Sequence, residues 1–359
     1  MIRNTKNCSI LCQSKGEVFD MNYRSVVITR NGPPDVLQVM ETPLRAPVAG
    51  EVRVKILYTG VGFTDIIMRY GNYRFAPPIP FVPGYEIVGI VDAVGVEVAG
   101  IAVGQQVAAL TVYGGYAEYI YLLPSKLVPV PDGLDPVEVV SLILNYVTAY
   151  QMLHRIARVQ AGQTVLLTGA SGGVGNAILQ LGSLAGLKMY GTASKQKSEL
   201  VAQLGGVPID YNSEDPMKFI RAREPSGVDA VFDALGWHSA WRSYWLLRKG
   251  GWLVGYGVTT SIRNGRVDNN SALMSYILPA VLNVVPDGRH ATFYGITRVY
   301  RKDSAPFMED LPKLFQLLAE QKIQPVIAEI LPFTEAAHAH EMLENGKVHG
   351  KLVLKCAVS

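Results

Sequence analysis

Hydrophobic positions along the chain follow two different patterns, which meet near residue 145. From residue 23 to about residue 131, short runs of β-branched and aromatic residues are separated by turns that contain glycine and proline. Runs of this kind are typical of β-strands, and the sequence contains RSVVITR, EVRVKILYTGV, EIVGIVDAVG, QQVAAL and YAEYIYL. The first part of the chain is therefore predicted to form a compact, β-rich barrel domain.

Beyond residue 145, strand-like and helix-like segments alternate. The strand-like segments are TVLLTG, KMYGTAS, VDAVFDALG and GWLVGYGV, and the helix-like ones are VGNAILQLGSLAG, KSELVAQLG and AWRSYWLLRKG. In the first of these helices, one face carries Val174, Ile178, Leu181 and Ala185. The alternation predicts an α/β domain with a doubly wound parallel sheet covered by helices on both faces. From about residue 301, two helices and a final strand, GKLVLK, are expected to return to the first domain.

Composition narrows the class of protein. With 359 residues, of which 49% are hydrophobic and 18% charged, the chain is globular and long enough for two domains. A net charge of +3 is too small to predict binding to nucleic acid or to an anionic membrane. No apolar run approaches the roughly 18 residues of a membrane-spanning helix, and the N-terminus lacks the apolar core of a signal peptide. The first 20 residues are expected to be either a disordered extension or sequence upstream of the true start.

Cysteine usage points to a reducing compartment. The three cysteines are Cys8, Cys12 and Cys356, so residues 13–355 can hold neither a disulfide framework nor a thiolate metal cluster. Cys8 and Cys12 are interpreted as two free thiols rather than as half of a zinc site. A cytoplasmic location is therefore expected.

A cluster of glycines follows the strand TVLLTG and opens the next helix. The cluster consists of Gly169, Gly172, Gly173 and Gly175. A helix N-terminus has unpaired N–H groups and the positive end of the helix dipole, so it attracts anions. Glycines let the backbone approach a phosphate closely. A tight turn is the simpler interpretation, but the strand–turn–helix context favours dinucleotide binding.

The end of the second strand indicates which dinucleotide is bound. An NAD site usually has an acidic residue there to accept from the ribose 2′-hydroxyl. The segment YGTASKQKSEL instead offers Ser194, Lys195 and Lys197, with Glu199 already in the next helix. Hydroxyl and ammonium groups bind a 2′-phosphate, which an acid would repel. These residues favour NADPH, although lysines after a strand are often only solvated.

Several motifs together resemble a known family. The segments TGASGGVG and GTASKQK, preceded by GVGFTDIIMRYGNY and PFVPGYEIVG, are similar to those of the medium-chain dehydrogenase/reductases. The resemblance covers residues 23–355 and is closest to the zinc-independent quinone oxidoreductase (zeta-crystallin-like) branch, which includes related enoyl reductases. It implies a GroES-like β-barrel catalytic domain over residues 21–144 and 301–359. Residues 145–300 are then a doubly wound Rossmann domain that binds NADPH, with the active site between the two domains.

The resemblance also implies that no metal takes part. Zinc-dependent relatives carry a Cys in the segment TGVGFTD and a His in PGYEIVG, where this chain has Gly62 and Tyr85. Zinc prefers thiolate and imidazole ligands, and residues 23–145 contain neither Cys nor His. His338 and His340 lie in the C-terminal segment and are expected on the surface.

Cofactor-lining residues are carried over from the family by position. Residues 171–175 would hold the pyrophosphate, and Ser194, Lys197 and Tyr211 would surround the 2′-phosphate. Phe293, Tyr294 and a threonine of NYVTAY would lie near the nicotinamide, although core packing is the alternative for each aromatic. The full expected set is Thr148, Ser171, Gly172, Gly173, Val174, Gly175, Ser194, Lys197, Tyr211, Leu235, Gly236, Tyr256, Gly257, Phe293 and Tyr294.

Substrate contacts are expected from the first domain. Relatives usually have Asn at the position of Gly62, so a side-chain amide is lost here, whereas Phe63 and Asp65 are kept. Tyr73, in RYGNY, matches a tyrosine proposed as the proton donor of related enoyl reductases, and Tyr70 is a second candidate. Tyrosine, with an ordinary pKa near 10, is protonated at neutral pH and suits a donor. Packing of Tyr73 against the barrel is the alternative interpretation.

These features predict a zinc-independent, NADPH-dependent oxidoreductase that transfers a hydride to a quinone or to an activated C=C of an enone or enoyl substrate. A zinc-free alcohol dehydrogenase is less favoured, because an alkoxide needs stabilisation. The alternative of another class is a non-catalytic NADPH-binding protein of the crystallin type. A homodimer is expected to form through the last strand of the second domain, HATFYGITRVY.

Overall fold

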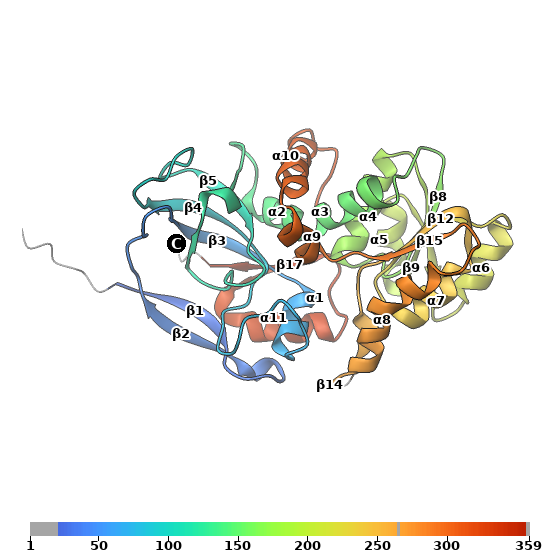
Figure 1. Ribbon diagram of the computed structural model, residues 1–359, viewed down its shortest axis with the longest axis horizontal. Coiled ribbons are helices and arrows are strands. Elements are labelled where there is room, and N and C mark those ends of the chain that lie inside the picture. The colour runs from blue at the N-terminus through green and yellow to red at the C-terminus, as the bar shows by residue number, and fades with distance from the viewer. Residues whose placement is uncertain (1–20, 264–265, 357–359) are drawn as a thin grey trace, which may run out of the picture.

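The computed structural model describes residues 21–263 and 266–356. These form two lobes joined by a central group of helices that includes α3 (Val147–Tyr150), α9 (Ile296–Lys302) and α10 (Ala305–Ala319) (Figure 1). We call them the barrel lobe and the parallel-sheet lobe. The predicted N-terminal extension, with Cys8 and Cys12, lies outside the described residues. Within the described ranges, no helix combines the length and the apolar character needed to cross a bilayer.

The barrel lobe contains a seven-stranded sheet with the order β16-β17-β3-β4-β5-β7, and β6 also pairs with β3. On β3, Val52, Val54 and Ile56 are fully buried and alternate with less buried residues, as expected of a strand with one face on a core. The C-terminal strand β17 pairs with β3, so segments about 290 residues apart in the sequence share this sheet. Its strands are β3 (Val52–Val61), β4 (Glu86–Val94), β5 (Gln106–Leu110), β6 (Tyr119–Leu122), β7 (Val128–Pro129), β16 (Ile327–Pro332) and β17 (Lys351–Lys355).

The remaining elements of the barrel lobe surround this sheet. β1 and β2 form an antiparallel pair of their own. The elements are β1 (Asn22–Ile28), β2 (Leu37–Pro43), α1 (Phe63–Arg69), α2 (Pro136–Ser141), α11 (Ala336–Glu344) and the short turns η1 (Pro34–Val36), η2 (Pro124–Lys126) and η7 (Phe333–Glu335).

The parallel-sheet lobe confirms the doubly wound prediction. Its six strands are all parallel, in the order β10-β9-β8-β11-β12-β15. The order reverses between β8 and β11, which is the switch point where such folds bind ligands. All residues of β8 and β11 are buried, because helices cover both faces. The strands are β8 (Thr164–Leu167), β9 (Lys188–Ala193), β10 (Gly206–Asp210), β11 (Val228–Asp233), β12 (Leu247–Gly255) and β15 (His290–Phe293).

Helices of this lobe follow the predicted apolar stripes. In α4, Ile178 and Leu181 are buried, as their spacing predicts. The remaining elements are α4 (Gly173–Leu184), α5 (Ser198–Gln203), α6 (Pro216–Arg223), α7 (Trp237–Tyr244), α8 (Asn269–Leu282), η5 (Lys195–Lys197), η6 (Thr259–Ser261) and the short pair β13 (Ile262–Arg263) and β14 (Arg266–Val267).

Two features differ from the expected pattern. HATFYGITRVY is not one strand, because β15 ends at Phe293 and the helix α9 begins at Ile296, after Gly295. A helical run through α2, η3 (Leu142–Tyr146), α3 and η4 (Gln151–Ile156) crosses the expected domain boundary at residue 145. The run is buried almost throughout, so it shows no polar face from which its helical period could be read.

His340 is buried, so the expectation that it lies on the surface is wrong. Its Nδ1 lies 3.0 Å from a guanidinium nitrogen of the fully buried Arg69, which also donates to Glu344 at 2.7 Å. A guanidinium group only donates, so Nδ1 accepts, and Nε2–H can donate to the Tyr116 hydroxyl 3.1 Å away. Burial, together with Arg69, lowers the pKa of His340 well below its usual value and keeps the ring neutral. His338 is exposed, as expected.

Candidate active site

The residues predicted to line the cofactor gather at one edge of the parallel sheet. Carboxyl ends of parallel strands meet at the same edge, and each of five strands is followed by members of the predicted set. Phe293 is the last residue of a sixth strand, β15. The residues just after the strands are Ser171 after β8, Ser194 after β9, Tyr211 after β10, Leu235 and Gly236 after β11, and Tyr256 and Gly257 after β12.

The turn after β8 needs its glycines for two reasons. Gly169 has a positive φ of 68°, which favours glycine. A Cβ on Gly175 would lie 2.5 Å from the carbonyl oxygen of Gly169, so the start of α4 packs directly on the turn. Gly172 precedes α4 and is exposed, and no side chain caps the helix. The N–H groups of this helix end, which no side chain caps, therefore fit an anionic group such as a pyrophosphate.

Gly173 serves a packing contact that the sequence analysis did not identify. A Cβ at this position would lie 2.3 Å from the side-chain amide nitrogen of Asn145. Asn145 is buried in η3, and the predicted nicotinamide-side residue Thr148 follows it by one helical turn, also buried. Val174 is half-buried in the first turn of α4. The glycine turn and the central helices therefore form one packed unit.

Lys197 lies against the C-terminal loop that precedes β17. Its Nζ donates to the carbonyl oxygens of Gly346, at 2.8 Å, and Val348, at 3.1 Å. Burial lowers its pKa. Tyr211 is exposed, and its backbone N–H donates to the carbonyl of the residue before Ser194. Ser194, Lys197 and Tyr211, the residues predicted to surround the 2′-phosphate, thus lie at the same end of the sheet. The loop 345–350 also lies there, and nothing in the sequence predicted it.

Two adjacent residues of the C-terminal segment contact both lobes. Gly350 donates its N–H to the carbonyl of Ser171 in the glycine turn, at 3.3 Å. Lys351 forms a buried ion pair with Glu86 at the start of β4. Glu86 also accepts from the N–H of Leu144 at 2.6 Å. None of these contacts was anticipated, because the partners are far apart in sequence.

The turns after β11 and β12 are held in fixed conformations. The buried carboxylate of Asp233 accepts from the N–H groups of Leu235 and Gly236, both at 3.0 Å. Gly236 has a φ of 119°. A Cβ on Gly257 would lie 2.3 Å from the carbonyl oxygen of Ala234, so the two turns touch. These two turns are therefore held in place at the carboxyl edge of the parallel sheet, where the cofactor is predicted to bind and which we call the cofactor edge.

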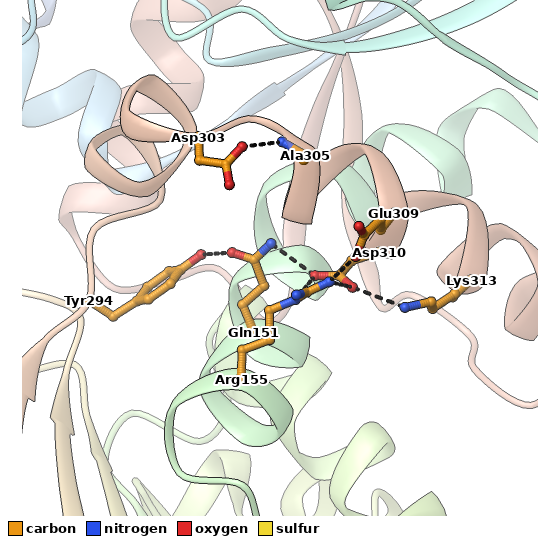
Figure 2. Close-up of polar contacts among 8 residues, drawn as sticks. All are labelled: Gln151, Arg155, Tyr294, Asp303, Ala305, Glu309, Asp310 and Lys313. Carbon is orange, nitrogen blue, oxygen red and sulfur yellow. Dashed lines mark hydrogen bonds and ion pairs between the residues drawn. The ribbon is translucent and has the colours of Figure 1, made fainter.

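The predicted aromatic residues at the ends of β12 and β15 differ in environment. Tyr294 is buried, and its hydroxyl donates to the side-chain oxygen of Gln151 at 2.7 Å. Figure 2 shows how Gln151 in turn donates to Asp310, which also binds Arg155. The hydroxyl of Tyr294 therefore serves this network, and burial raises its pKa.

The other two aromatic residues are half-buried, and each contacts an adjoining element. Phe293 packs its ring on Tyr276 of α8, with a centroid distance of 4.5 Å. Tyr256 binds β11 through its backbone N–H, which donates to the carbonyl oxygen of Asp233 at 2.8 Å. Their predicted roles near the cofactor stay predictions.

Asp65 organises the backbone on the barrel side. Its buried carboxylate accepts from the N–H of Gly62 at 2.9 Å and from that of Gly84 at 3.0 Å. Burial raises the pKa of Asp65 to about 7. Phe63 is half-buried at the start of α1, and Tyr70 at its end lies beside the guanidinium of Arg69. Asp65 therefore fixes two backbone segments, and its contact with substrate stays a prediction.

Tyr73 belongs to a cluster of three hydroxyl groups, formed with Tyr85 and Thr297 and called here the hydroxyl cluster. The Tyr73 hydroxyl lies 2.6 Å from that of Tyr85 and donates to Thr297 Oγ1 at 2.8 Å, and Tyr85 also contacts Thr297. Tyr85 and Thr297 are each 1% exposed, whereas Tyr73 is half-buried. Thr297 lies in the first turn of α9, directly after β15. The cluster thus connects the barrel lobe to the cofactor edge.

The described residues offer few ligands for a metal ion. Among the described residues, no group of three or more His, Cys, Asp or Glu side chains could hold a metal ion. Tyr85 occupies the position where zinc-dependent relatives carry a ligand, and its hydroxyl is engaged in the hydroxyl cluster. Metal-free catalysis stays a prediction.

Comparison with known proteins agrees with this arrangement. Residues 48–132 match the family described as alcohol dehydrogenase GroES-like domain, and residues 204–354 match that described as zinc-binding dehydrogenase. The chain is 30% identical to rat quinone oxidoreductase, over 92% of this chain and 97% of that protein. It is 35% identical to the zebrafish synaptic vesicle membrane protein VAT-1 homolog over 67% of this chain, and this match spans only half the length of that relative.

Among solved structures, the mycobacterial protein Rv1454c complexed with NADPH superposes with a TM-score of 0.81. It is 29% identical in sequence, and the alignment covers 93% of this chain and 99% of that one. The chain therefore belongs to the medium-chain dehydrogenase/reductase superfamily, in the group that includes quinone oxidoreductases and VAT-1 homologs.

Proposed function

We propose that the protein is an NADPH-dependent oxidoreductase that reduces a quinone or the activated C=C of an enone or enoyl substrate. The observation that carries this proposal is the 2.8 Å contact between the Tyr73 hydroxyl and Thr297. Thr297 follows β15 within a few residues, so the contact supports a role for the Tyr73 O–H beside the edge of the sheet that would hold a dinucleotide. A proton source next to a cofactor edge is what reduction of such acceptors requires.

NADPH would be held by the residues at the carboxyl edge of the sheet. The uncapped start of α4 and the exposed Gly172 suit the pyrophosphate. Lys197, Ser194 and Tyr211 suit the 2′-phosphate, and no acidic residue stands at the tip of β9. When bound, the cofactor supplies a hydride from its nicotinamide ring. Two similar proteins support NADPH as the cofactor. One is named a quinone oxidoreductase, and the structure of the other is a complex with NADPH.

The side chains of the protein would then supply the proton that the reduced substrate needs. The electrophilic carbon of the substrate receives the hydride, and the negative charge that develops needs hydrogen-bond donors or a proton. With an enone, the O–H bond of Tyr73 breaks and its proton forms a C–H bond at the carbon next to the carbonyl. The Tyr73 phenolate is afterwards reprotonated by water. With a quinone, the hydroquinone anion is stable enough to take its proton from water directly.

Assembly as a homodimer belongs to the same proposal. Strand β15 is at the edge of the parallel sheet, and unpaired edges are prone to association. Helix α8, which packs beside β15, exposes Leu273, Ile277 and Val281, each more than 40% accessible. A second copy of the chain that pairs along β15 would bury this apolar face.

Two further parts of the proposal rest on sequence. The boundaries 21–144 with 301–359 and 145–300 would divide the catalytic from the cofactor domain. A cytoplasmic location would suit Cys356, which is buried and is a free thiol within the described part of the chain. Fractionation of cells that produce the tagged protein tests the location.

The test of function is NADPH oxidation followed at 340 nm with 1,2-naphthoquinone and with a panel of enones, before and after exhaustive chelation. We expect turnover on at least one acceptor class and no loss on chelation. A tightly bound zinc whose removal abolishes turnover would refute metal independence. Tight NADPH binding without turnover on any acceptor would instead favour the non-catalytic, crystallin-type alternative.

A further inference from the structure

In the hydroxyl cluster, two further hydroxyl groups surround the proposed proton donor Tyr73, although proton donation itself needs only one. Tyr73 has two hydroxyl neighbours, Tyr85 of the barrel lobe at 2.6 Å and Thr297 of the central helix α9 at 2.8 Å. Both neighbours are almost completely buried, whereas Tyr73 is half-buried. The cluster therefore has one member within reach of a ligand and two behind it.

Each hydroxyl carries one proton and can accept from two donors. While Tyr73 is neutral, its own proton can be donated to Thr297 or to a ligand. Once Tyr73 has given its proton away, its oxygen becomes an acceptor only, and both neighbouring O–H groups can donate to it. Hydrogen bonds to an ionised oxygen are about twice as strong as those between neutral groups. The arrangement thus stabilises the phenolate more than the neutral phenol.

We propose that Tyr85 and Thr297 are positioning residues that stabilise the phenolate of Tyr73 when Tyr73 protonates the substrate. This inference rests on the proposed function, in which Tyr73 is the proton donor. In the step itself, the O–H bond of Tyr73 breaks and a C–H bond forms with the electron pair of the enolate. The negative charge passes to the Tyr73 oxygen, where the two neighbouring O–H groups donate, and water later returns the proton. Neither residue changes its oxidation state or its proton count.

The charged and titratable groups around Tyr73 make this stabilisation necessary. Burial raises the pKa of Tyr73, and the hydrogen bonds with Thr297 and Tyr85 lower it. Arg301 of α9 also lowers it, whereas the charge of Asp65 on α1 raises it. On α8, Tyr276 is the facing titratable group. Without its two hydroxyl neighbours, a partly buried phenolate would keep only Arg301 as a favourable partner.

The experiment compares Tyr85→Phe and Thr297→Val with Tyr300→Phe as the matched control. Tyr300 lies on α9 like Thr297, and its buried hydroxyl has no hydrogen-bond partner among the described residues. The phenolate of Tyr73 is titrated by ultraviolet difference absorbance near 295 nm. The difference between each protein and the same protein carrying Tyr73→Phe isolates the Tyr73 signal. In parallel, kcat for an enone and for a quinone is measured against pH.

Loss of either donor is expected to raise the apparent pKa of Tyr73 by about one unit and to lower enone turnover about tenfold. Each donor makes a charge-assisted hydrogen bond to the phenolate, which is stronger than a bond between neutral groups. Quinone turnover and NADPH affinity should change less than about twofold. Tyr300→Phe should match the wild type in every measurement. Thr297→Ser, which keeps the hydroxyl, should restore the wild-type titration and rate and so separates loss of the donor from misfolding.

An unchanged Tyr73 titration and an unchanged enone rate in both folded variants would overturn the inference. An equal loss on enone and quinone, with no shift in the titration, would also count against it, because that pattern indicates a structural role. Failure of the proposed function is visible separately, since Tyr73→Phe would then leave enone turnover unaffected whatever the titration shows.

Discussion

The ammonium group of Lys197 donates to the backbone carbonyl of Gly346, 2.8 Å away, although the two residues are 149 positions apart in the sequence. A lysine predicted to hold the 2′-phosphate is thus already partnered by a loop that leads into β17. A lysine ammonium has three N–H donors, and two of them contact the carbonyl oxygens of Gly346 and Val348. If Lys197 holds the 2′-phosphate as predicted, its third N–H could donate to the phosphate, and such a charge-assisted bond is stronger than a bond to a neutral carbonyl.

NADPH is expected to bind at least about tenfold more tightly than NADH, a difference of about 1.4 kcal/mol. Lys197→Ala should weaken NADPH binding and leave NADH binding nearly unchanged. Isothermal titration calorimetry with both cofactors measures this, and Lys249→Ala, an exposed lysine near the start of β12 and so at the opposite end of that strand from Tyr256, is the matched control. Equal dissociation constants for the two cofactors in the wild type would contradict the prediction.

Tyr73→Phe is expected to cut enone turnover by about a hundredfold, within the usual contribution of a general acid. Quinone turnover should fall much less, because water can protonate the hydroquinone anion. Stopped-flow or steady-state rates on both substrates measure the difference. Tyr70→Phe removes a hydroxyl from the same segment and should have little effect. A large loss with Tyr70→Phe and none with Tyr73→Phe would transfer the role to Tyr70.

Asp65 makes the stability of the protein depend on pH. Its folded-state pKa, about 7, lies above the ordinary value of 3.8, so the folded protein binds more protons between these values. The free energy of unfolding should therefore decrease as the pH rises from about 4 to 7, by about 1.4 kcal/mol per unit of pKa difference. The measurement is urea denaturation of wild type and Asp65→Asn at pH 4.5 and 7.5.

The difference between the two proteins isolates Asp65 from other buried carboxyl groups, such as Glu86 and Asp233, whose pKa values are also raised by burial. In Asp65→Asn, the free energy of unfolding should depend much less on pH. The amide keeps one oxygen acceptor, so one of the two hydrogen bonds from the backbone N–H groups of Gly62 and Gly84 is lost. An identical pH dependence in both proteins would show that Asp65 is not responsible.

A dimer is expected at micromolar concentration. Light scattering should give twice the mass of the chain for the wild type. Ile277→Glu combined with Val281→Glu places charges on the exposed face of α8 and should produce a folded monomer. A wild-type protein with the mass of a single chain would refute the expected assembly.

Much of the fold could be predicted because short-range patterns encode it. The doubly wound sheet follows from alternating strands and helices, and the glycine turn follows from residues adjacent in sequence. Contacts between distant segments left no such signal. His340 next to Arg69 and Lys197 next to Gly346 are pairs that only the tertiary fold brings together.

Other differences between the predicted and the observed site arise where a short segment of sequence fits more than one structure. Thr297 lies in a run of β-branched and aromatic residues that favours a strand, yet the chain turns into α9 after Gly295. The sequence pattern therefore predicts a strand where the hydroxyl partner of Tyr73 lies on a helix. Tyr85 was recognised only as a replacement for a zinc ligand, because its contact with Tyr73 depends on how the loop after α1 folds back.

The neighbouring contacts of Gly350 and Lys351 have a mechanical consequence. One residue is bonded to the glycine turn of the parallel-sheet lobe, and the next is paired with Glu86 in the barrel lobe. Gly350 has a φ of 99°, and a Cβ there would lie 2.2 Å from the carbonyl of Val326, so this position admits little but glycine. Two consecutive residues thus join the glycine turn to the barrel sheet, so a shift of this short segment would disturb both lobes at once.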